Sequence, residues 1–313
     1  MSFSLATVRV GGNPTPVLAI GERRWRIADI APKALEPEPY RGLMNVFDHW
    51  DTTEPILVEA YEALVEGTDT TEPLAPLESA EDVLTPLQYP RKVLLTGANY
   101  HAHMREDGGH TDWSKDTKNP VFFFKPPTTT LVGSGKTVRY PVQSEKFDYE
   151  LELGVVIGKR GRRLTVENAM DYVAGYTVVL DLSARDWQRD PKSIMKWDLF
   201  GGKGFDDSCP VGPGIVPARY VDENNLQLTF KLNGENRQGA NTKDMIWSIA
   251  EQLALLTQHV TVEPGDILST GTPAGVGLGA GTWMSVGDTL EGSITGLGTL
   301  AVEIVEDHND DTV

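Results

Sequence analysis

Two glutamates with one residue between them, Glu150 and Glu152, are the strongest chemical signal in the chain. They lie in the stretch 148–158, whose apolar residues predict a β-strand. Side chains two positions apart on a strand project from the same face, so the two carboxylates would lie side by side. A like-charged pair beside an apolar run is costly unless a cation lies between its members. The pattern indicates a cation site or, alternatively, the solvated face of an edge strand.

A third carboxylate, Asp181, directly follows the apolar stretch 176–180, which also predicts a strand. Together with Glu150 and Glu152 it would form a set of oxygen ligands without cysteine or histidine. Such a set suits Mg²⁺ or Mn²⁺, with Ca²⁺ as an alternative, and does not suit zinc. Taken alone, Asp181 is equally consistent with a residue that caps the end of a strand.

His103 and Glu106 are three residues apart, after the apolar stretch 93–96. On a helix this spacing places both side chains on one face. A histidine beside a carboxylate is a candidate general base, because the carboxylate fixes the ring tautomer and stabilises the charged ring. The alternative is an ion pair on the surface of a short helix.

Three further groups predict contacts with an anionic substrate. Arg185 and Gln188 have helical spacing and would bind a carboxylate or ketone oxygen. Lys203 lies among glycines, which allow close backbone approach, and would neutralise an enolate or oxyanion. The stretch 269–277 is rich in glycine, and its backbone N–H groups would form an anion-binding nest. Each group is also consistent with an ordinary turn.

The composition excludes several classes of protein. The 313 residues carry a net charge of −17 and a pI near 4.7, which argues against binding of nucleic acid or of anionic membranes. The single cysteine, Cys209, excludes an intrachain disulfide and is typical of a reducing compartment. The first ten residues lack the pattern of a signal peptide, and no apolar window is long enough to span a membrane. We therefore expect a cytoplasmic protein.

The order of apolar and turn-forming segments predicts a β-dominated α+β fold. We expect a small N-terminal α+β domain over 1–70, a linker over 71–91, a catalytic domain over 92–305 and an acidic tail over 306–313. Within the N-terminal domain, residues 42–66 have helical periodicity, with Asp51 and Glu54 at the spacing of a capping box. No dinucleotide-binding or Walker motif is present, so we expect no nucleotide cofactor.

The motifs and their order resemble those of the fumarylacetoacetate hydrolase family over about residues 90–305. The resemblance extends to the acylpyruvase and 2-hydroxyhepta-2,4-diene-1,7-dioate isomerase-like branch. The motifs that carry it include Gly97-Ala98-Asn99-Tyr100, Phe124-Lys125-Pro126, Glu150-Leu151-Glu152-Leu153, Ala184-Arg185-Asp186, Gly202-Lys203-Gly204-Phe205-Asp206 and Thr270-Gly271-Thr272-Pro273-Ala274-Gly275-Val276-Gly277.

The resemblance implies a mixed β-roll fold, a homodimer, and Mg²⁺ or Mn²⁺ held by Glu150, Glu152 and Asp181. It implies that His103 and Glu106 activate water, that Lys203 lies near the developing negative charge, and that a lid over 104–119 closes on the substrate. The substrate-binding residues expected from these motifs are Tyr100, Lys125, Arg185, Gln188, Thr270, Gly271 and Thr272.

One departure limits what the resemblance implies about the reaction. The founding hydrolases carry an aspartate two residues before the tyrosine of the first motif, where this chain has Ala98. The branch with this shorter motif contains several chemistries on nearly the same ligands, so the fold and metal transfer more readily than the reaction.

We predict a hydrolase that cleaves a carbon–carbon bond in a 2,4-diketo acid of acylpyruvate type, in catabolism of aromatics or sugar acids. The products would be pyruvate and a carboxylic acid. The alternatives are a decarboxylase, isomerase, tautomerase or hydratase acting on a 2-oxo or 2-hydroxydienoate acid, and a non-catalytic, metal-dependent binding protein for small acids.

Overall fold

The computed structural model describes residues 2–77, 79, 82–106, 114–142 and 144–307. The strands in this part of the chain are β1 (Ser4–Val10), β2 (Asn13–Ile20), β3 (Arg23–Arg26), β4 (Val93–Gly97), β5 (Val121–Lys125), β6 (Leu131–Val132), β7 (Thr137–Arg139), β8 (Phe147–Asp148), β9 (Leu151–Ile157), β10 (Val173–Leu180), β11 (Ser183–Ala184), β12 (Cys209–Pro217), β13 (Gln227–Leu232), β14 (Glu235–Asn241), β15 (Ile267–Ser269), β16 (Thr289–Ile294) and β17 (Gly298–Val305).

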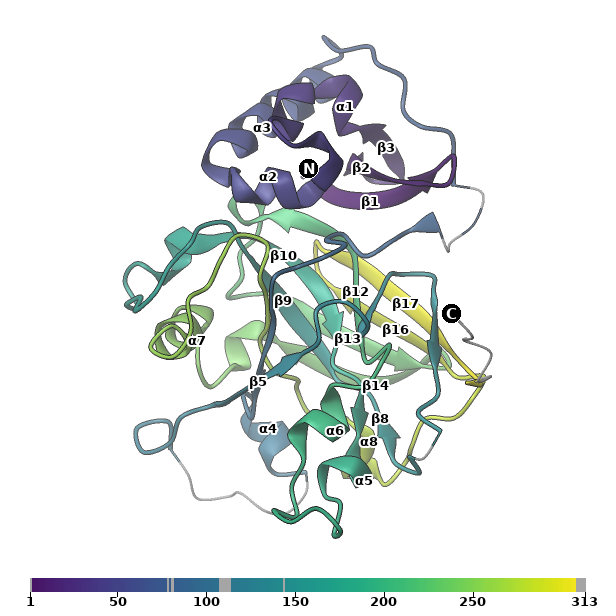
Figure 1. Cartoon of the computed structure of the whole chain (residues 1–313), viewed down its shortest axis with the longest axis vertical. Coiled ribbons are helices and arrows are strands. Elements are labelled where there is room, and N and C mark those ends of the chain that lie inside the picture. Colours follow the sequence, from purple (N-terminus) through teal and green to yellow (C-terminus); the bar gives the residue numbers. More distant parts are fainter. Residues whose placement is uncertain (1, 78, 80–81, 107–113, 143, 308–313) are drawn as a thin grey trace.

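Most helices lie at the two ends of the molecule, and α7 lies beside the strands (Figure 1). The α-helices are α1 (Ile27–Ile30), α2 (Leu43–Asp48), α3 (Trp50–Glu66), α4 (His101–Met104), α5 (Arg185–Gln188), α6 (Leu199–Lys203), α7 (Ile249–Leu256) and α8 (Gly277–Ala280). Short 3-10 turns connect several elements: η1 (Pro32–Leu35), η2 (Pro39–Arg41), η4 (Ala169–Tyr172), η5 (Ala218–Tyr220) and η6 (Thr242–Asp244).

Two sheets organise the described residues. The larger is ten-stranded over these residues, in the order β3-β2-β1-β12-β10-β9-β15-β4-β5, with β6 paired to β12 outside that path. The second has the order β14-β13-β16-β17-β7, and β8 and β11 form a separate short pair. The prediction of a β-dominated α+β fold is confirmed, and Figure 1 shows strands occupying the middle of the molecule.

The main apolar core lies between the two sheets. Strands β9 and β10 contribute alternate residues to it, and strands β13, β16 and β17 face them from the second sheet. The core-facing residues of β9 are Leu151, Leu153, Val155 and Ile157, all fully buried. Because strand side chains alternate, Glu150 and Glu152 project from the opposite face of the large sheet. The strand is thus held by the core on one face while its other face carries the carboxylates.

The pairing of β9 with β10 determines where Asp181 lies. The two strands are antiparallel, with Leu151 opposite Leu180 and Glu152 opposite Val179. One residue further on, the backbone N–H of Asp181 donates to the carbonyl oxygen of Glu150 over 2.8 Å. The register therefore places Asp181 beside Glu150.

The N-terminal residues extend the large sheet. Strand β1 pairs with β12 at Leu5 and Ile215, and helices α1 to α3 lie beside β1 to β3 at the same end of the molecule (Figure 1). A second apolar cluster joins this unit to the large sheet, with Phe47, Trp50 and Leu57 on the helical side. Helices α4, α5, α6 and α8 lie at the opposite end of the molecule.

The helical prediction over 42–66 is confirmed with two differences. The segment forms two helices, α2 and α3, and α3 begins at Trp50 with His49 as its N-cap. The predicted capping box at Asp51 is therefore wrong. Trp50 stacks on Phe47 with ring centroids 5.0 Å apart, and this packing starts the helix earlier. Asp51 lies in the first turn, where an acidic side chain favours the helix N-terminus.

Two predicted segments lie partly outside the described residues. These are residues 107–113 of the predicted lid and 308–313 of the predicted tail, and both the lid and the tail stay predictions. Among the described helices, none has the length and apolar character needed to cross a membrane.

We predict that Leu5→Ala destabilises the whole protein by about 2–5 kcal/mol, the usual cost of a cavity in a packed core. Leu5 is fully buried and pairs with Ile215 of β12, so its loss would weaken the sheet that both parts share. Denaturant unfolding followed by tryptophan fluorescence and circular dichroism measures this. Arg9→Ala, an exposed position near the end of the same strand, is the control and should change stability little. Separate unfolding of the N-terminal strands in Leu5→Ala would contradict a shared core.

Candidate metal centre and active site

Three buried carboxylates meet where β9 and β10 lie side by side. Ligand oxygens of Glu150, Glu152 and Asp181 all lie within 4.8 Å of one another, and each residue is at most 5% exposed. The residues that the sequence assigned to a cation site are therefore together in space. The alternative of a solvated edge strand is wrong, because β9 lies inside the sheet between β10 and β15.

Three basic side chains contact this triad. The Lys203 ammonium lies 2.6 Å from Glu150 Oε2 and 2.5 Å from Asp181 Oδ2. Lys125 lies 2.9 Å from Asp181 Oδ1, and Arg185 Nη2 donates to Glu150 Oε1 over 2.5 Å. Burial opposes ionisation of Glu150, but Lys203 and Arg185 outweigh it, so the pKa of Glu150 lies well below its usual range. Glu150 is thus stabilised as an anion.

Glu152 has a different environment. Its Oε2 accepts hydrogen bonds from Ser269 Oγ at 2.6 Å and from the backbone N–H of Gly271 at 2.8 Å. Burial raises the pKa of Glu152 well above its usual value, and the neighbouring carboxylates of Asp181 and Glu150 raise it further. A divalent cation fits this all-oxygen donor set, because it would relieve the repulsion that disfavours the Glu152 anion.

The predicted base pair forms next to the triad. Nδ1 of His103, on α4, lies 2.7 Å from Glu106 Oε2. Glu106 is itself held, because its Oε1 accepts a 2.6 Å hydrogen bond from the backbone N–H of Gly275. The carboxylate at Nδ1 leaves Nε2 as the ring nitrogen available to a substrate or water. The alternative of a free surface ion pair does not describe this geometry, since both side chains are only about 15% exposed.

Residues 271–278, which we call the carboxylate-binding loop, use their N–H groups for the protein's own acids. Gly271 binds Glu152 and Gly275 binds Glu106. The N–H groups of Gly277 and Leu278 bind the two oxygens of Asp148, at 2.6 and 3.0 Å. The stretch 269–277, predicted as an anion-binding nest, does bind anions. Among the described residues, these anions are carboxylates of the protein's own side chains.

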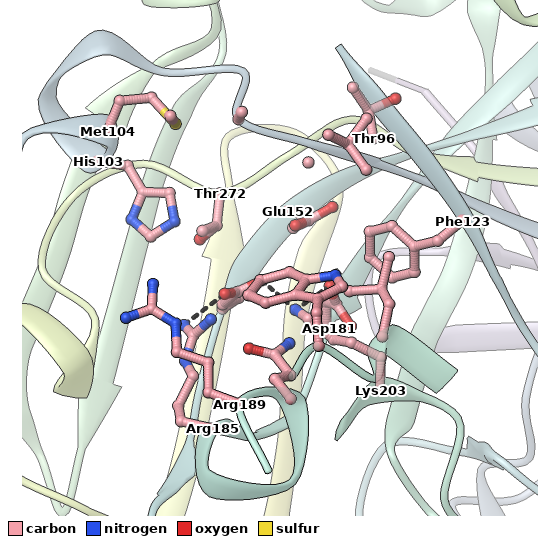
Figure 2. A pocket seen from close by; sticks show the side chains of 17 residues that line it. Thr96, His103, Met104, Phe123, Glu152, Asp181, Arg185, Arg189, Lys203 and Thr272 are labelled. Atoms are coloured by element: carbon pink, nitrogen blue, oxygen red, sulfur yellow. Dashed lines mark hydrogen bonds and ion pairs between the residues drawn. The ribbon is translucent and has the colours of Figure 1, made fainter. Parts of the chain in front are cut away.

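A cavity of about 320 Å³ opens beside the triad. Figure 2 shows His103 and Thr272 on one side of it, Phe123 on the other, and Glu152 between them. Its polar wall includes Thr96, His103, Glu150, Glu152, Asp181, Arg185, Gln188, Arg189, Lys203 and Thr272. Its less polar wall is formed by Gly97, Ala98, Met104, Val121, Phe123, Trp197 and Leu199. A small acid with one apolar segment fits such a lining.

Four predicted substrate-binding residues lie outside this lining. Lys125 is buried behind Asp181, and its ammonium also donates to the carbonyl oxygens of Leu182 and Ser208. Tyr100 is 2% exposed, and Thr270 donates its hydroxyl to the carbonyl oxygen of Leu153. Gly271 donates to Glu152, as described above. Contact of these four residues with a substrate stays a prediction.

Sequence reasoning missed two residues that shape the cavity. Asp148 accepts a 2.8 Å hydrogen bond from Arg185 Nε and so orients that guanidinium. Asp148 lies two residues before Glu150, just as Glu150 lies two residues before Glu152. This spacing in the sequence is the signal that could have identified Asp148. Arg189 lies four residues after Arg185, which on a helix is the same face, and it lines the cavity as this spacing suggests.

Comparison with known proteins finds a matching family model and similar proteins. The family model described as fumarylacetoacetate (FAA) hydrolase C-terminal matches residues 92–305. A mitochondrial oxaloacetate tautomerase of Rattus norvegicus is 38% identical over 236 residues, which cover 74% of this chain and 72% of that protein.

Two solved structures are also similar to this chain. The fumarylpyruvate hydrolase of Pseudomonas aeruginosa, in complex with Mn²⁺ and pyruvate, is 35% identical with a TM-score of 0.62, covering 70% of this chain and 91% of that one. The maleylpyruvate hydrolase of a Sphingobium species, with manganese(II) and pyruvate, is 27% identical with a TM-score of 0.73, covering 97% and 100%. Relatives of this chain thus bind a divalent metal and a small 2-oxo acid.

We predict that Glu152→Gln lowers Mn²⁺ affinity by at least about 100-fold while leaving the metal-free protein equally stable or more stable. The amide oxygen can keep the hydrogen bonds from Ser269 and Gly271, and the change removes one of three repelling carboxylates. Titration calorimetry and thermal unfolding with and without Mn²⁺ measure both effects. Glu145→Gln, an exposed acid on the same approach to β9, is the control. Normal Mn²⁺ binding by Glu152→Gln would contradict the ligand assignment.

We also predict that metal binding releases a proton. The pKa of Glu152 is raised, so below that pKa the metal-free protein holds a proton there that a cation must displace. Affinity should increase about tenfold per pH unit below that pKa and level off above it. The free energy of unfolding of the metal-free protein should change in the opposite direction with pH. The protonated Glu152 contributes its full stabilisation at low pH, and this stabilisation is lost as the pH rises through the raised pKa. Calorimetry in buffers of different ionisation enthalpy counts the protons, and zero release at mildly acidic pH would contradict the prediction.

Proposed function

The chain belongs to the fumarylacetoacetate hydrolase family, and from this premise we propose that it hydrolyses a carbon–carbon bond in a 2,4-diketo acid of acylpyruvate type. The observation that carries the proposal is the arrangement of the His103–Glu106 pair and the Glu150–Glu152–Asp181 triad around one cavity. A base and a cation site within one small cavity are what the hydrolysis of such an acid requires.

The triad would hold Mg²⁺ or Mn²⁺ through one oxygen of each carboxylate. When bound, such an ion supplies a Lewis acid that polarises a 2-oxo group and stabilises negative charge on its oxygen. Around it, Arg185 and Gln188 line the cavity on one turn of α5 and would orient the substrate carboxylate. Burial alone would lower the pKa of Lys203, but Asp181 and Glu150 raise it, so its ammonium stays charged beside the reacting centre.

The dyad accounts for the protons in the reaction. Nε2 of His103 accepts a proton from water, whose oxygen attacks the C4 carbonyl, and Glu106 stabilises the imidazolium through Nδ1. The C3–C4 bond then breaks, its electron pair passes to the pyruvate fragment, and C3 takes up a proton from His103. One water is consumed, and the products are pyruvate and a carboxylic acid.

A tautomerase acting on a 2-oxo diacid is the second candidate, and the 38% identity to an oxaloacetate tautomerase favours it specifically. In this reaction the same dyad would move a proton between C3 and the 2-oxo oxygen of the substrate, with no water attack. The triad, Lys203 and Arg185 would have unchanged roles. Decarboxylation and hydration remain alternatives that the same groups support.

We also propose a cytoplasmic location and a homodimer. The single cysteine is typical of a reducing compartment. The edge strand β5 exposes Val121 and Phe124, each more than half exposed, and apolar side chains on an open sheet edge support pairing with a second copy.

The proposed function is tested by turnover of acetylpyruvate, fumarylpyruvate and oxaloacetate with Mg²⁺, following pyruvate, CO₂ and the enol absorbance separately. Pyruvate formed with an equimolar carboxylic acid supports hydrolysis. Loss of enol absorbance from oxaloacetate without cleavage supports the tautomerase, and release of CO₂ supports decarboxylation. Activity that survives EDTA would exclude the proposed role of the triad in holding a catalytic metal ion.

We predict that His103→Asn lowers kcat by about 10²–10⁴-fold, the usual contribution of a general base, while Mn²⁺ affinity is unchanged. His103 contacts Glu106 and lines the cavity without belonging to the triad, so proton transfer is lost and the metal ligands are kept. Steady-state kinetics and calorimetry measure the two quantities. His101→Asn, exposed on the same helix, is the matched control. A wild-type kcat in the His103→Asn protein would contradict the assignment of His103 as the general base.

A further inference from the structure

The backbone between the two glutamate ligands has a strand partner on one side only. Strand β9 pairs with β10 along its length, but on the other edge its pairing with β15 ends at Gly154, opposite Ser269. Leu151, which separates Glu150 from Glu152, lies beyond that end, and none of the described strands pairs with it there. Leu151 is fully buried, and a buried main-chain group without a partner costs free energy. Other groups must therefore complete the sheet at this residue.

Two side chains take the place of the missing strand. Gln238 Oε1 accepts a hydrogen bond from the Leu151 N–H over 2.9 Å, and the Thr272 hydroxyl donates to the Leu151 carbonyl oxygen, also over 2.9 Å. Gln238 Nε2 in turn donates to Thr272 Oγ1 over 2.8 Å. These three bonds close a ring, which we call the Gln238–Thr272 ring, at the residue that separates the two ligands.

The donors and acceptors of this ring have one consistent arrangement. The Leu151 N–H needs an acceptor, so the oxygen of the Gln238 amide faces it. Both amide N–H groups are then used, one by Thr272 and one by the carbonyl oxygen of Pro273 over 2.7 Å. The Thr272 hydroxyl accepts from Gln238, and its own hydrogen goes to Leu151. Rotation of either side chain would leave a buried polar group unpaired.

The ring joins three parts of the site. Gln238 lies on β14, in the second sheet, and is only 2% exposed. The carboxylate-binding loop approaches β14 closely because residue 275 is a glycine: a Cβ at Gly275 would lie 2.0 Å from the carbonyl oxygen of Arg237. Thr272 belongs to that loop and lines the cavity (Figure 2). The ring therefore links β14, the loop and the strand that carries the ligands.

The backbone at Leu151 sets how the two glutamates lie relative to each other. Glu150 and Glu152 share a face of β9 only while the strand stays extended between them. On one edge, the Asp181 N–H holds the Glu150 carbonyl oxygen. The Gln238–Thr272 ring holds the other edge. Groups that fix metal ligands from outside commonly contribute about 10–100-fold to metal affinity, so this restraint has a measurable effect.

We propose that Gln238 is a positioning residue for the metal centre. Together with Thr272 it holds Leu151 in place, and so keeps the two glutamate ligands at the spacing that a divalent cation requires. This inference rests on the proposed function in one respect, since it takes the triad as a metal site. It does not depend on which reaction follows.

The test measures Mn²⁺ affinity by calorimetry, together with denaturant unfolding of the metal-free protein. Gln238→Met has a similar shape but can make none of the three hydrogen bonds of Gln238, and we expect about tenfold weaker Mn²⁺ binding. Thr272→Val breaks the ring from its other side and should weaken binding to a similar extent. Thr272→Ser keeps the hydroxyl and should bind Mn²⁺ like the wild-type protein.

The ring also predicts that the two losses are not additive. Gln238 and Thr272 hold each other in place, so replacing either one releases the other from Leu151. The double variant Gln238→Met/Thr272→Val should therefore lose little more Mn²⁺ affinity than either single variant. Two independent effects would instead multiply to a loss of about a hundredfold.

Thr257→Val is the matched control for the loss of a buried polar side chain. Thr257 is fully buried and its hydroxyl accepts the Leu164 N–H over 2.9 Å, much as Gln238 accepts that of Leu151, but it does not line the cavity. Thr257→Val should lower the free energy of unfolding and leave Mn²⁺ affinity unchanged. A merely structural role for Gln238 would give Gln238→Met this same pattern.

Two results would overturn the inference: wild-type Mn²⁺ affinity in Gln238→Met, or losses that multiply in the double variant. If Gln238→Met does not fold, Thr272→Val and Thr272→Ser decide, and equal Mn²⁺ affinity in these two would overturn it.

The outcomes separate this inference from the proposed function. The expected affinity differences without turnover of any diketo acid would overturn the proposed hydrolase and support the role of Gln238. Turnover of a diketo acid with unchanged Mn²⁺ affinity in Gln238→Met would overturn only the role of Gln238. No Mn²⁺ binding by the wild-type protein would overturn both.

Discussion

The repulsion among three carboxylates in a space that excludes water is the constraint on which this structure depends. Glu150, Glu152 and Asp181 are brought together by strand alternation and by the register of β9 with β10. Neither feature is adjustable without turning apolar residues out of the core, since a shift by one residue would exchange the two faces of the strand. The fold therefore forces the charges together, and the surrounding groups must compensate for them.

The three carboxylates are compensated by different groups, and this difference suits the site to binding a cation. Glu150 and Asp181 contact ammonium or guanidinium groups, whereas Glu152 receives a hydroxyl and a backbone N–H. Glu150 is thereby prepared as an anion, and Glu152 gains most from an arriving cation. Lys203 bridges Glu150 and Asp181, so the group proposed to meet negative charge on the substrate is positioned by the metal ligands themselves.

Much of this site could be predicted from the sequence because its spacing is local. The alternation at 150 and 152, the strand end at 181 and the helical spacing of His103 and Glu106 each follow from the geometry of one element. Contacts between distant segments could not be predicted in the same way. Neither Lys125 behind Asp181 nor Gly275 beside Glu106 follows from any spacing, because the pairing of strands and the path of the loops decide them. The capping box at Asp51 failed for a related reason, since aromatic packing at Trp50 determined where α3 begins.

The carboxylate-binding loop has a consequence for how genetic variation in this protein should be interpreted. It holds Glu106, Asp148 and Glu152 through main-chain N–H groups, which only a substitution to proline would delete. Its shape depends on glycines: Gly271 and Gly275 have φ values of +95° and +105°, and a Cβ at Gly275 would overlap the backbone of Arg237. A mutational scan would therefore record this loop as sensitive at glycines, which carry no functional group of their own. An inactive variant at Gly275 would report a displaced acid elsewhere in the site, not a missing catalytic residue.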